Sequence, residues 1–159
     1  MNVRAHRFAA RLRWTGAERG ATTSYTSYSR EYVIEAEGKP ALTGSADPHF
    51  LGDAAHYNPE DLLVAALSAC HLLSYLAQCS RAGIAVVAYG DDASGEMTLI
   101  DGKIRFREVM LRPRVAIADS ARIEEATALH ERAHADCFIA NSVNFPVRHE
   151  ATVTSAQPA

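Results

Sequence analysis

Three cysteines, Cys70, Cys79 and Cys137, are the residues of this 159-residue chain best suited to nucleophilic or redox chemistry. An odd, small number of cysteines is not typical of a structural disulfide framework, so each is expected to be an inert core residue or a reactive thiol. A thiol reacts as its thiolate and needs a neighbour that lowers its pKa from about 8.5. Cys70 and Cys79 lie nine residues apart, which places them on opposite sides of a helix and excludes a shared site.

An arginine is the cation that the sequence offers to Cys70. Strand alternation predicts one shared face for Tyr28, Arg30, Tyr32 and Ile34. A buried arginine needs an anion, and Glu60 or Asp61 could supply one. Arg19, in a glycine-flanked turn, is the competing candidate.

The spacing of Glu60 and Cys70 adds a geometric constraint. Ten residues separate them on one predicted helix, which is about 15 Å along its axis. One arginine does not easily reach both from a single chain. If Glu60 orients an arginine that touches Cys70, we expect the two to come from different subunits.

The helix that carries Cys70 has strong local signals. Asn58 is a good N-cap, Pro59 suits the first helical position, and Gly83 follows the predicted end near Arg81. Its body is apolar almost all round, so it must be buried on most sides. A chain of this size has difficulty surrounding such a helix alone, which predicts a homodimer whose partner covers it.

The remaining elements are predicted from periodicity and turn residues. Asp101-Gly102 is typical of a type I′ hairpin turn. A second helix is predicted over 121–136, with Ile123, Ala126, His130, Ala133 and Cys137 on one stripe. Strands are predicted over 6–14 (half-buried), 22–36, 84–89, 96–100, 103–111, 115–117 and 147–153. Without βαβ alternation this order indicates an α+β fold, and the length indicates one domain over residues 1–159.

Composition excludes some classes of protein. The net charge is −3 with no basic patch, which argues against nucleic-acid binding. No uninterrupted apolar run reaches the roughly 20 residues of a membrane span, and no apolar signal segment precedes the first strand. We therefore expect a folded, soluble, cytoplasmic protein.

Two segments carry a resemblance to a known family. They are NPEDLLVAALSACH at 58–71 and AHADCFIANSV at 133–143, and the order of elements agrees over nearly the whole chain. The chain resembles the OsmC/Ohr family of osmotically inducible protein C and organic hydroperoxide resistance proteins. The resemblance implies an OsmC-like fold in an intertwined homodimer, with an N-terminal β-hairpin, a buried central helix and a C-terminal antiparallel sheet carrying a second helix.

The same resemblance implies roles for particular residues. Cys70 would be the peroxidatic cysteine, Cys137 the resolving cysteine, and Glu60 the glutamate that holds the catalytic arginine. The implied substrates are organic hydroperoxides and the implied reductant is a small dithiol of the lipoyl type, with no cofactor. Residues expected to line an apolar approach for the substrate are Leu63, Leu67 and Phe138.

The chain also departs from the family pattern. Ohr-type members carry the arginine in a turn that corresponds to Arg19, and OsmC-type members carry it shortly before Asn-Pro-Glu, where this chain has His49-Phe50. The proline that follows the second cysteine is Phe138 here. The resemblance is therefore to an OsmC-like branch, and it leaves Arg30 and Arg19 both open.

Three other functions compete with this interpretation. His130, His134 and Cys137 have helical i, i+4, i+7 spacing that could bind zinc, with His71 completing the ligand set. A carrier of small hydrophobic ligands would keep its cysteines inert. A Cys-His hydrolase would need a histidine base held by a third group, which the sequence does not locate.

Overall fold

The computed structural model describes residues 5–156. Its contacts divide the chain after Leu62 into two units, residues 1–62 and 63–159, and each is described by itself. Together they contain helices and mainly antiparallel strands without βαβ alternation, so the predicted α+β class is confirmed.

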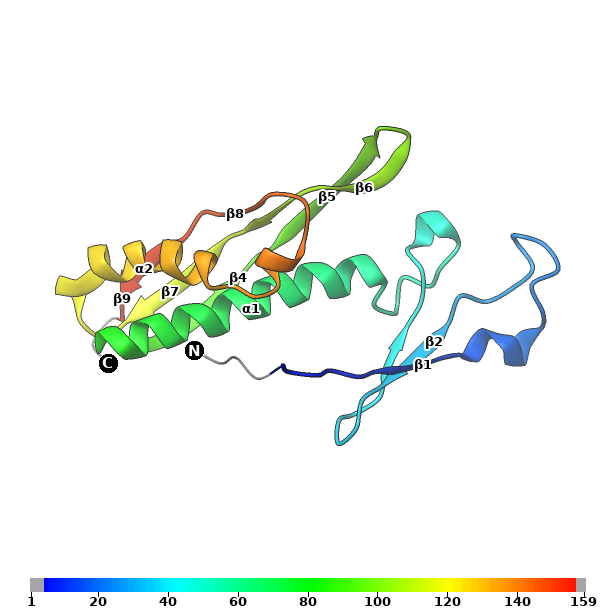
Figure 1. Ribbon diagram of the computed structural model, residues 1–159, viewed down its shortest axis with the longest axis horizontal. Coiled ribbons are helices and arrows are strands. Elements are labelled where there is room, and N and C mark those ends of the chain that lie inside the picture. The colour runs from blue at the N-terminus through cyan, green and yellow to red at the C-terminus, as the bar shows by residue number, and fades with distance from the viewer. Residues whose placement is uncertain (1–4, 157–159) are drawn as a thin grey trace. The chain divides into compact units, whose positions relative to one another are not determined.

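The first unit is built on a three-stranded antiparallel sheet of order β1-β2-β3 (Figure 1). Its strands are β1 (Arg11–Trp14), β2 (Tyr32–Glu35) and β3 (Leu42–Gly44). Trp14 pairs with Tyr32, and Tyr32 pairs in turn with Gly44. Pairing of β2 in this sheet orients the residues just before it, Arg30 and Glu31.

The predicted half-buried strand over 6–14 is wrong in extent and in burial. Only Arg11–Trp14 is paired, and all four residues are exposed. Phe8 is 93% exposed and Leu12 63%. The alternation marks a face suited to burial, but no described element of the chain covers it.

The predicted strand over 22–36 is also shorter than expected. Before β2 the chain turns, because serine and threonine side chains offer the backbone local partners that compete with sheet pairing. Ser27 Oγ accepts from the backbone N–H of Thr23 and of Ser24, at 3.1 and 2.9 Å.

Helix α1 (Pro59–Ala82) begins and ends where the sequence predicts. Asn58 Oδ1 accepts from the Asp61 N–H at 2.7 Å, and Asp61 Oδ2 accepts from the Asn58 N–H at 3.3 Å. These two bonds satisfy N–H groups at the start of the helix that have no helical partner. Gly83, with φ of 68°, takes the left-handed conformation that ends it.

The second unit contains two three-stranded sheets, of order β4-β7-β9 and β5-β6-β8. The central strands β7 and β6 pair antiparallel with β4 and β5, and parallel with β9 and β8. Asp101 and Gly102, with φ of 51° and 75°, form the predicted hairpin turn between β5 and β6. The strands are β4 (Val86–Asp91), β5 (Ser94–Ile100), β6 (Lys103–Leu111), β7 (Pro113–Ile117), β8 (Val147–His149) and β9 (Thr152–Ser155).

The strands of one sheet continue into the strands of the other at three places, and the chain bends at each of these junctions. Asp91 Oδ1 accepts from the Arg112 N–H at 2.6 Å, and the Glu150 N–H donates to the Leu111 carbonyl at 2.9 Å. The predicted single strand over 147–153 is therefore wrong: it is β8 and β9. The chain there runs parallel to β6 and β7 and must bend where they bend.

Helix α2 (Ile123–Ala135) packs on α1 and on the β4-β7-β9 sheet (Figure 1). Its predicted inward stripe is confirmed, because Ala126, His130 and Ala133 are buried. Cys79 is 1% exposed in this core. The buried core residues here are Tyr75, Cys79, Ile84, Val115, Ile117, Ala126, Leu129 and Ala133.

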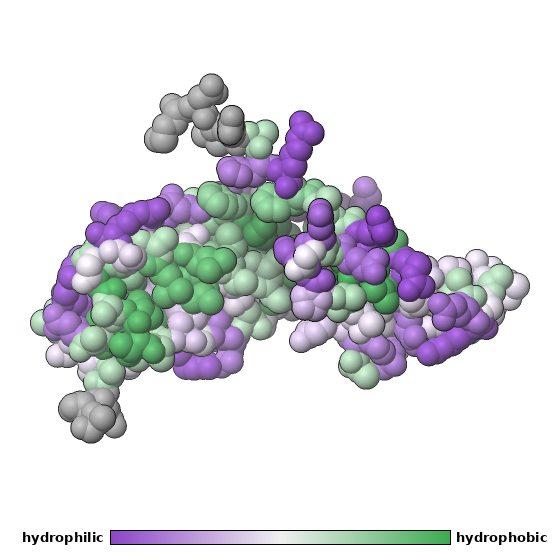
Figure 2. Space-filling model, turned by 90° about the horizontal axis from the view of Figure 1, so that it is seen from below, coloured by the Kyte–Doolittle hydropathy of each residue, from purple (hydrophilic) through white to green (hydrophobic). Residues whose placement is uncertain are grey.

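One face of α1 remains uncovered in the single chain. Leu73 is 66% exposed and Leu76 36%, and Figure 2 shows hydrophobic residues gathered over this part of the molecule. By length and composition alone, α1 could cross a membrane, contrary to the expectation from uninterrupted apolar runs. The core helix of a soluble protein passes the same test, and α1 buries His71 and Tyr75 against its own chain.

Candidate functional site

The second unit brings two of the three cysteines together. Cys70 is half-buried on α1, and Cys137 is 1% exposed just past the end of α2. The Cys70 side chain lies close enough to the Cys137 thiol to influence its pKa. Burial raises the pKa of Cys137 to about 11, and Cys70 beside it adds to the rise. Two thiols this close to each other can be oxidised to a disulfide without a large movement of the chain.

A group of histidines occupies the same two helices. His71 Nε2 and His130 Nδ1 share a hydrogen bond of 3.0 Å, and the two side chains are 0% and 1% exposed. Burial lowers the pKa of His71 to about 4 and that of His130 to about 3, with neighbouring histidines contributing to both shifts. His149 lies beside both rings, with centroids at 5.3 and 5.9 Å. Both rings of the pair are therefore neutral at physiological pH.

These histidines make the stability of the fold sensitive to acid. Between pH 6.5 and about 4 the unfolded chain binds protons that the folded chain excludes, so the free energy of unfolding falls as the pH falls. For His71 alone the loss is on the order of 3 kcal/mol. Urea unfolding at several pH values measures it. The His71→Leu/His130→Leu variant should show a flatter dependence, and a pH dependence equal to that of the wild type would contradict the assignment.

The first unit holds a separate pocket of about 420 Å³. Arg30 and Glu60 both line it. Glu60 also lies close enough to Tyr32 for its charge to raise the pKa of that phenol further, after the rise that burial causes. The other lining residues are Trp14, Thr22, Tyr28, Tyr32, Ser45, Ala46, Asp47, Phe50 and Pro59.

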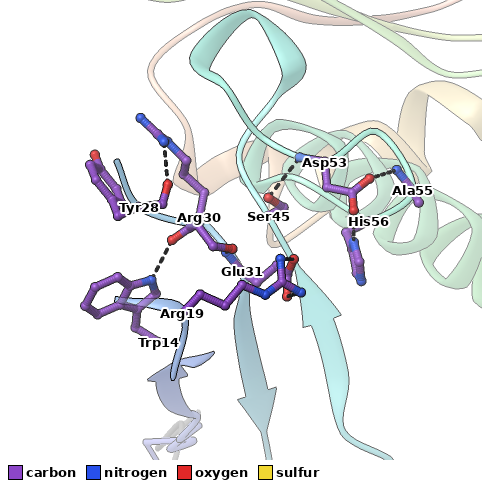
Figure 3. A network of polar contacts seen from close by, with 10 residues as sticks. Trp14, Arg19, Tyr28, Arg30, Glu31, Ser45, Asp53, Ala55 and His56 are labelled. Atoms are coloured by element: carbon purple, nitrogen blue, oxygen red, sulfur yellow. Dashed lines mark hydrogen bonds and ion pairs between the residues drawn. The ribbon is translucent and has the colours of Figure 1, made fainter. Parts of the chain in front are cut away.

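Arg30 is held by aromatic rings and backbone oxygens. Its guanidinium carbon lies 4.0 Å from the Tyr28 ring centroid and 4.9 Å from that of Tyr25. It donates to the Tyr28 carbonyl at 2.6 Å (Figure 3) and also to the Tyr25 carbonyl. Among the described residues it forms no ion pair, with Glu60 or with any other carboxylate.

The competing arginine is already engaged. Arg19 Nη1 lies 2.8 Å from Glu31 Oε1, and its side chain is 67% exposed. Figure 3 shows Arg30 and Glu31 leaving the chain on opposite sides, so the Arg19–Glu31 pair lies away from Arg30. Asp61, the other predicted anion, is used in capping α1. The geometry therefore favours Arg30 and Glu60 over Arg19 and Asp61.

The three residues predicted to line a substrate approach differ in exposure. Leu67 is fully buried and packs with Val109 and Leu111, so it has no surface to offer an incoming molecule. Leu63 is half-buried beside that cluster, and Phe138, next to Cys137, is 81% exposed.

The arrangement of the histidines does not favour the zinc alternative. Within residues 5–156 no three His, Cys, Asp or Glu side chains converge as metal ligands. His130 bonds to His71, and Cys137 lies near Cys70 instead of completing a ligand set with His134. The hydrophobic-carrier alternative stays a prediction, with the aromatic pocket of the first unit as its candidate site.

Two features were not predicted from the sequence. The His71–His130 pair was missed, although a histidine on the otherwise apolar stripe of α2 was a usable signal. The Tyr25 ring beside Arg30 was missed because it lies in a turn, where strand alternation gives no information.

Comparison with known proteins gives a consistent result. Residues 52–152 match the family model for OsmC-like protein. An OsmC-like protein of unknown function from Vibrio cholerae O1 biovar eltor is 32% identical with a TM-score of 0.85, over 93% of this chain and 100% of that one. An organic hydroperoxide resistance protein from Elizabethkingia anophelis is 22% identical with a TM-score of 0.69, over 98% and 100% of the two chains. The uncharacterized protein YmaD of Bacillus subtilis (strain 168) is 21% identical over 154 residues, 93% of this chain and 95% of YmaD.

Proposed function

Because the chain belongs to the OsmC-like protein family, we propose that it is a thiol-dependent peroxidase that reduces organic hydroperoxides through a cycle between Cys70 and Cys137. The observation that carries the proposal is the proximity of these two thiols, which are 67 positions apart in the sequence and close enough for Cys70 to raise the pKa of Cys137. An organic hydroperoxide resistance protein among the similar structures supports the choice of substrate class.

The proposed cycle has three balanced steps. The Cys70 thiolate attacks the distal oxygen of the hydroperoxide, the O–O bond breaks, and the alkoxide leaves as the alcohol after taking a proton. Cys70 is then a sulfenic acid. The Cys137 thiol attacks the Cys70 sulfur, so that an S–S bond replaces the S–O bond and water leaves with the Cys137 proton. A small dithiol, of the lipoyl type in our proposal, reduces the disulfide by exchange and is itself oxidised.

The assignment of one thiol to each role follows from their surroundings. Cys70 keeps exposed surface through which a peroxide can reach it, while Cys137 is buried. A buried thiol with a pKa near 11 is a poor nucleophile towards free peroxide at neutral pH. It attacks efficiently only a sulfenic acid that forms beside it, which suits the resolving role.

Arg30 is proposed to supply the positive charge that stabilises the Cys70 thiolate and the developing oxygen anion. Glu60 would orient it. Since Glu60 and Cys70 are about 15 Å apart along α1, we propose that the arginine pocket serving Cys70 comes from the partner of a homodimer. The exposed leucines of α1 support such a partner, because an isolated chain leaves them in water.

Phe138 and Leu63 are proposed to present apolar surface to the alkyl part of the substrate, and Leu67 lies in the buried cluster against which Leu63 packs. This surface would favour alkyl hydroperoxides over hydrogen peroxide. We propose that residues 1–159 form one OsmC-like domain acting in the cytoplasm, where dithiol reductants are present.

The direct test is consumption of cumene hydroperoxide by the wild-type protein with dihydrolipoamide as reductant. We expect repeated turnover, faster with cumene hydroperoxide than with hydrogen peroxide. Thiols that stay reduced in the presence of cumene hydroperoxide, together with stoichiometric binding of a fatty acid, would favour the carrier function instead.

Replacing Arg30 and Arg19 one at a time distinguishes which of the two arginines activates Cys70. Arg30→Gln removes the charge while keeping a polar side chain, and we expect the rate of Cys70 oxidation to fall about a hundredfold. Arg19→Gln is the matched control and should change the rate less than about twofold, since it removes only an exposed ion pair. Stopped-flow measurement of the first oxidation gives both rates. The opposite ranking would assign the role to Arg19.

A further inference from the structure

The hydrogen bond between His71 and His130 joins the two helices that lead to the two reactive cysteines. His71 follows Cys70 directly on α1, and His130 lies on α2 seven residues before Cys137, which comes just after the end of that helix. The ring planes differ by 7° and the centroids are 5.3 Å apart. This separation is too large for face-to-face stacking and fits an edge-to-edge hydrogen bond of 3.0 Å.

The surroundings allow the His130 ring little freedom. The Tyr75 ring lies on it face to face, with centroids 3.8 Å apart and planes at 11°. The Tyr75 hydroxyl in turn donates to the Ala126 carbonyl at 3.1 Å, which ties it to α2. The contact therefore fixes the rotation of α2 about its axis as well as its distance from α1.

Burying this histidine pair in the core is energetically unfavourable. Each ring has a second nitrogen, His71 Nδ1 and His130 Nε2, that is buried without a hydrogen-bond partner among the described residues. Two apolar side chains of similar size would fill the same space without burying unpaired polar atoms. What the histidines provide, and apolar residues do not, is one directional bond that defines a single arrangement of the helices.

We propose that the His71–His130 bond is a positioning contact that holds Cys137 at reacting distance from Cys70. This inference rests on the proposed cycle, in which Cys137 must attack the Cys70 sulfur. His71 and His130 act through the backbone of their helices and need not touch the sulfur atoms. A shift of about 1 Å between reacting groups is enough to slow a reaction by about two orders of magnitude.

The test uses the geometry of amide side chains. The amide of glutamine reaches the position of a histidine Nε2, and that of asparagine reaches the position of Nδ1. The variant His71→Gln/His130→Asn can therefore rebuild the bond seen here, while His71→Asn/His130→Gln cannot. His71→Leu/His130→Leu removes the bond but keeps the volume. Gln78→Ala is the matched control, since it removes the exposed hydrogen bond between Gln78 and Asp136 that follows α2.

Disulfide formation is measured with diamide, which takes two hydrogen atoms from two thiols and so needs no peroxidase activity. We expect the leucine variant and the mismatched amide variant to form the Cys70–Cys137 disulfide at least about tenfold more slowly than the wild type. The matched amide variant should come within about threefold of it, and Gln78→Ala should be unchanged. Circular dichroism checks that each variant is folded.

Two results would overturn the inference. One is disulfide formation at the wild-type rate in the folded leucine variant. The other is an equal loss in both amide variants, which would point to disturbed packing instead of a lost directional bond. A wild-type protein that forms the disulfide with diamide but ignores cumene hydroperoxide would refute the proposed function and leave the positioning role intact.

Discussion

The Cys70→Ser variant is expected to lose hydroperoxide consumption altogether, down to the rate of the buffer. A serine hydroxyl cannot replace the thiolate, because peroxides do not oxidise it to an equivalent of sulfenic acid. Removal of the nucleophile should lower the rate of hydroperoxide consumption by a factor of about a thousand or more. The measurement is loss of cumene hydroperoxide with dihydrolipoamide in excess.

Cys79→Ala is the matched control for Cys70→Ser, because it removes a thiol from the same helix. Cys79 packs in the core between α1 and α2 and contacts neither reactive cysteine in the proposed cycle. We expect this variant to lose some stability and to keep its turnover. Activity that survives in Cys70→Ser, or disappears in Cys79→Ala, would contradict the assignment of the nucleophile.

The second large effect is expected from Cys137→Ser. Cys70 should still react once with hydroperoxide, because its reaction does not require the second thiol. The sulfenic acid then has no partner, so turnover should stop after one equivalent of alcohol. Further peroxide should convert Cys70 to sulfinic acid, a product that dithiols do not reduce.

Mass spectrometry of the treated Cys137→Ser protein distinguishes the outcomes. A gain of one and then two oxygen atoms on the peptide that contains Cys70 is the expected sequence of products. Unchanged steady-state turnover in this variant would show that an external thiol resolves the sulfenic acid directly. The proximity of the two cysteines would then have no part in catalysis.

The elements with strong local signals were predictable from the sequence. Asn58 and Gly83 mark the ends of α1 because a cap and a left-handed residue act within one turn of the chain. Asp101 and Gly102 specify their hairpin through their own backbone conformation. The stripe of α2 was predictable because one periodic face decides its burial.

Elements that depend on distant partners were not predictable in detail. The strand over 147–153 divides at Glu150 because it follows the bend of its parallel partners near Arg112, about forty positions earlier. The segment 6–14 alternates like a half-buried strand, but alternation does not say whether anything covers the apolar side.

The features of the candidate site also differ in whether the sequence alone could predict them. The pairing of Cys70 with Cys137 was expected from the family resemblance, and no local pattern would have revealed it. Our proposal of Arg30 over Arg19 needed the structure, because only the folded chain shows Arg19 bound to Glu31. The partner of His130 lies on another helix, so sequence spacing alone gave a zinc ligand set in place of a bonded pair.

The central claim is that Cys70 and Cys137 form one redox pair, and peptide mapping after a single equivalent of cumene hydroperoxide tests it most directly. The reaction is quenched with an alkylating agent, digested without reductant and analysed by mass spectrometry. We predict that the peptides containing Cys70 and Cys137 are recovered joined by a disulfide, with Cys79 alkylated as a free thiol. Recovery of Cys70 and Cys137 both alkylated, while hydroperoxide has been consumed, would contradict the account.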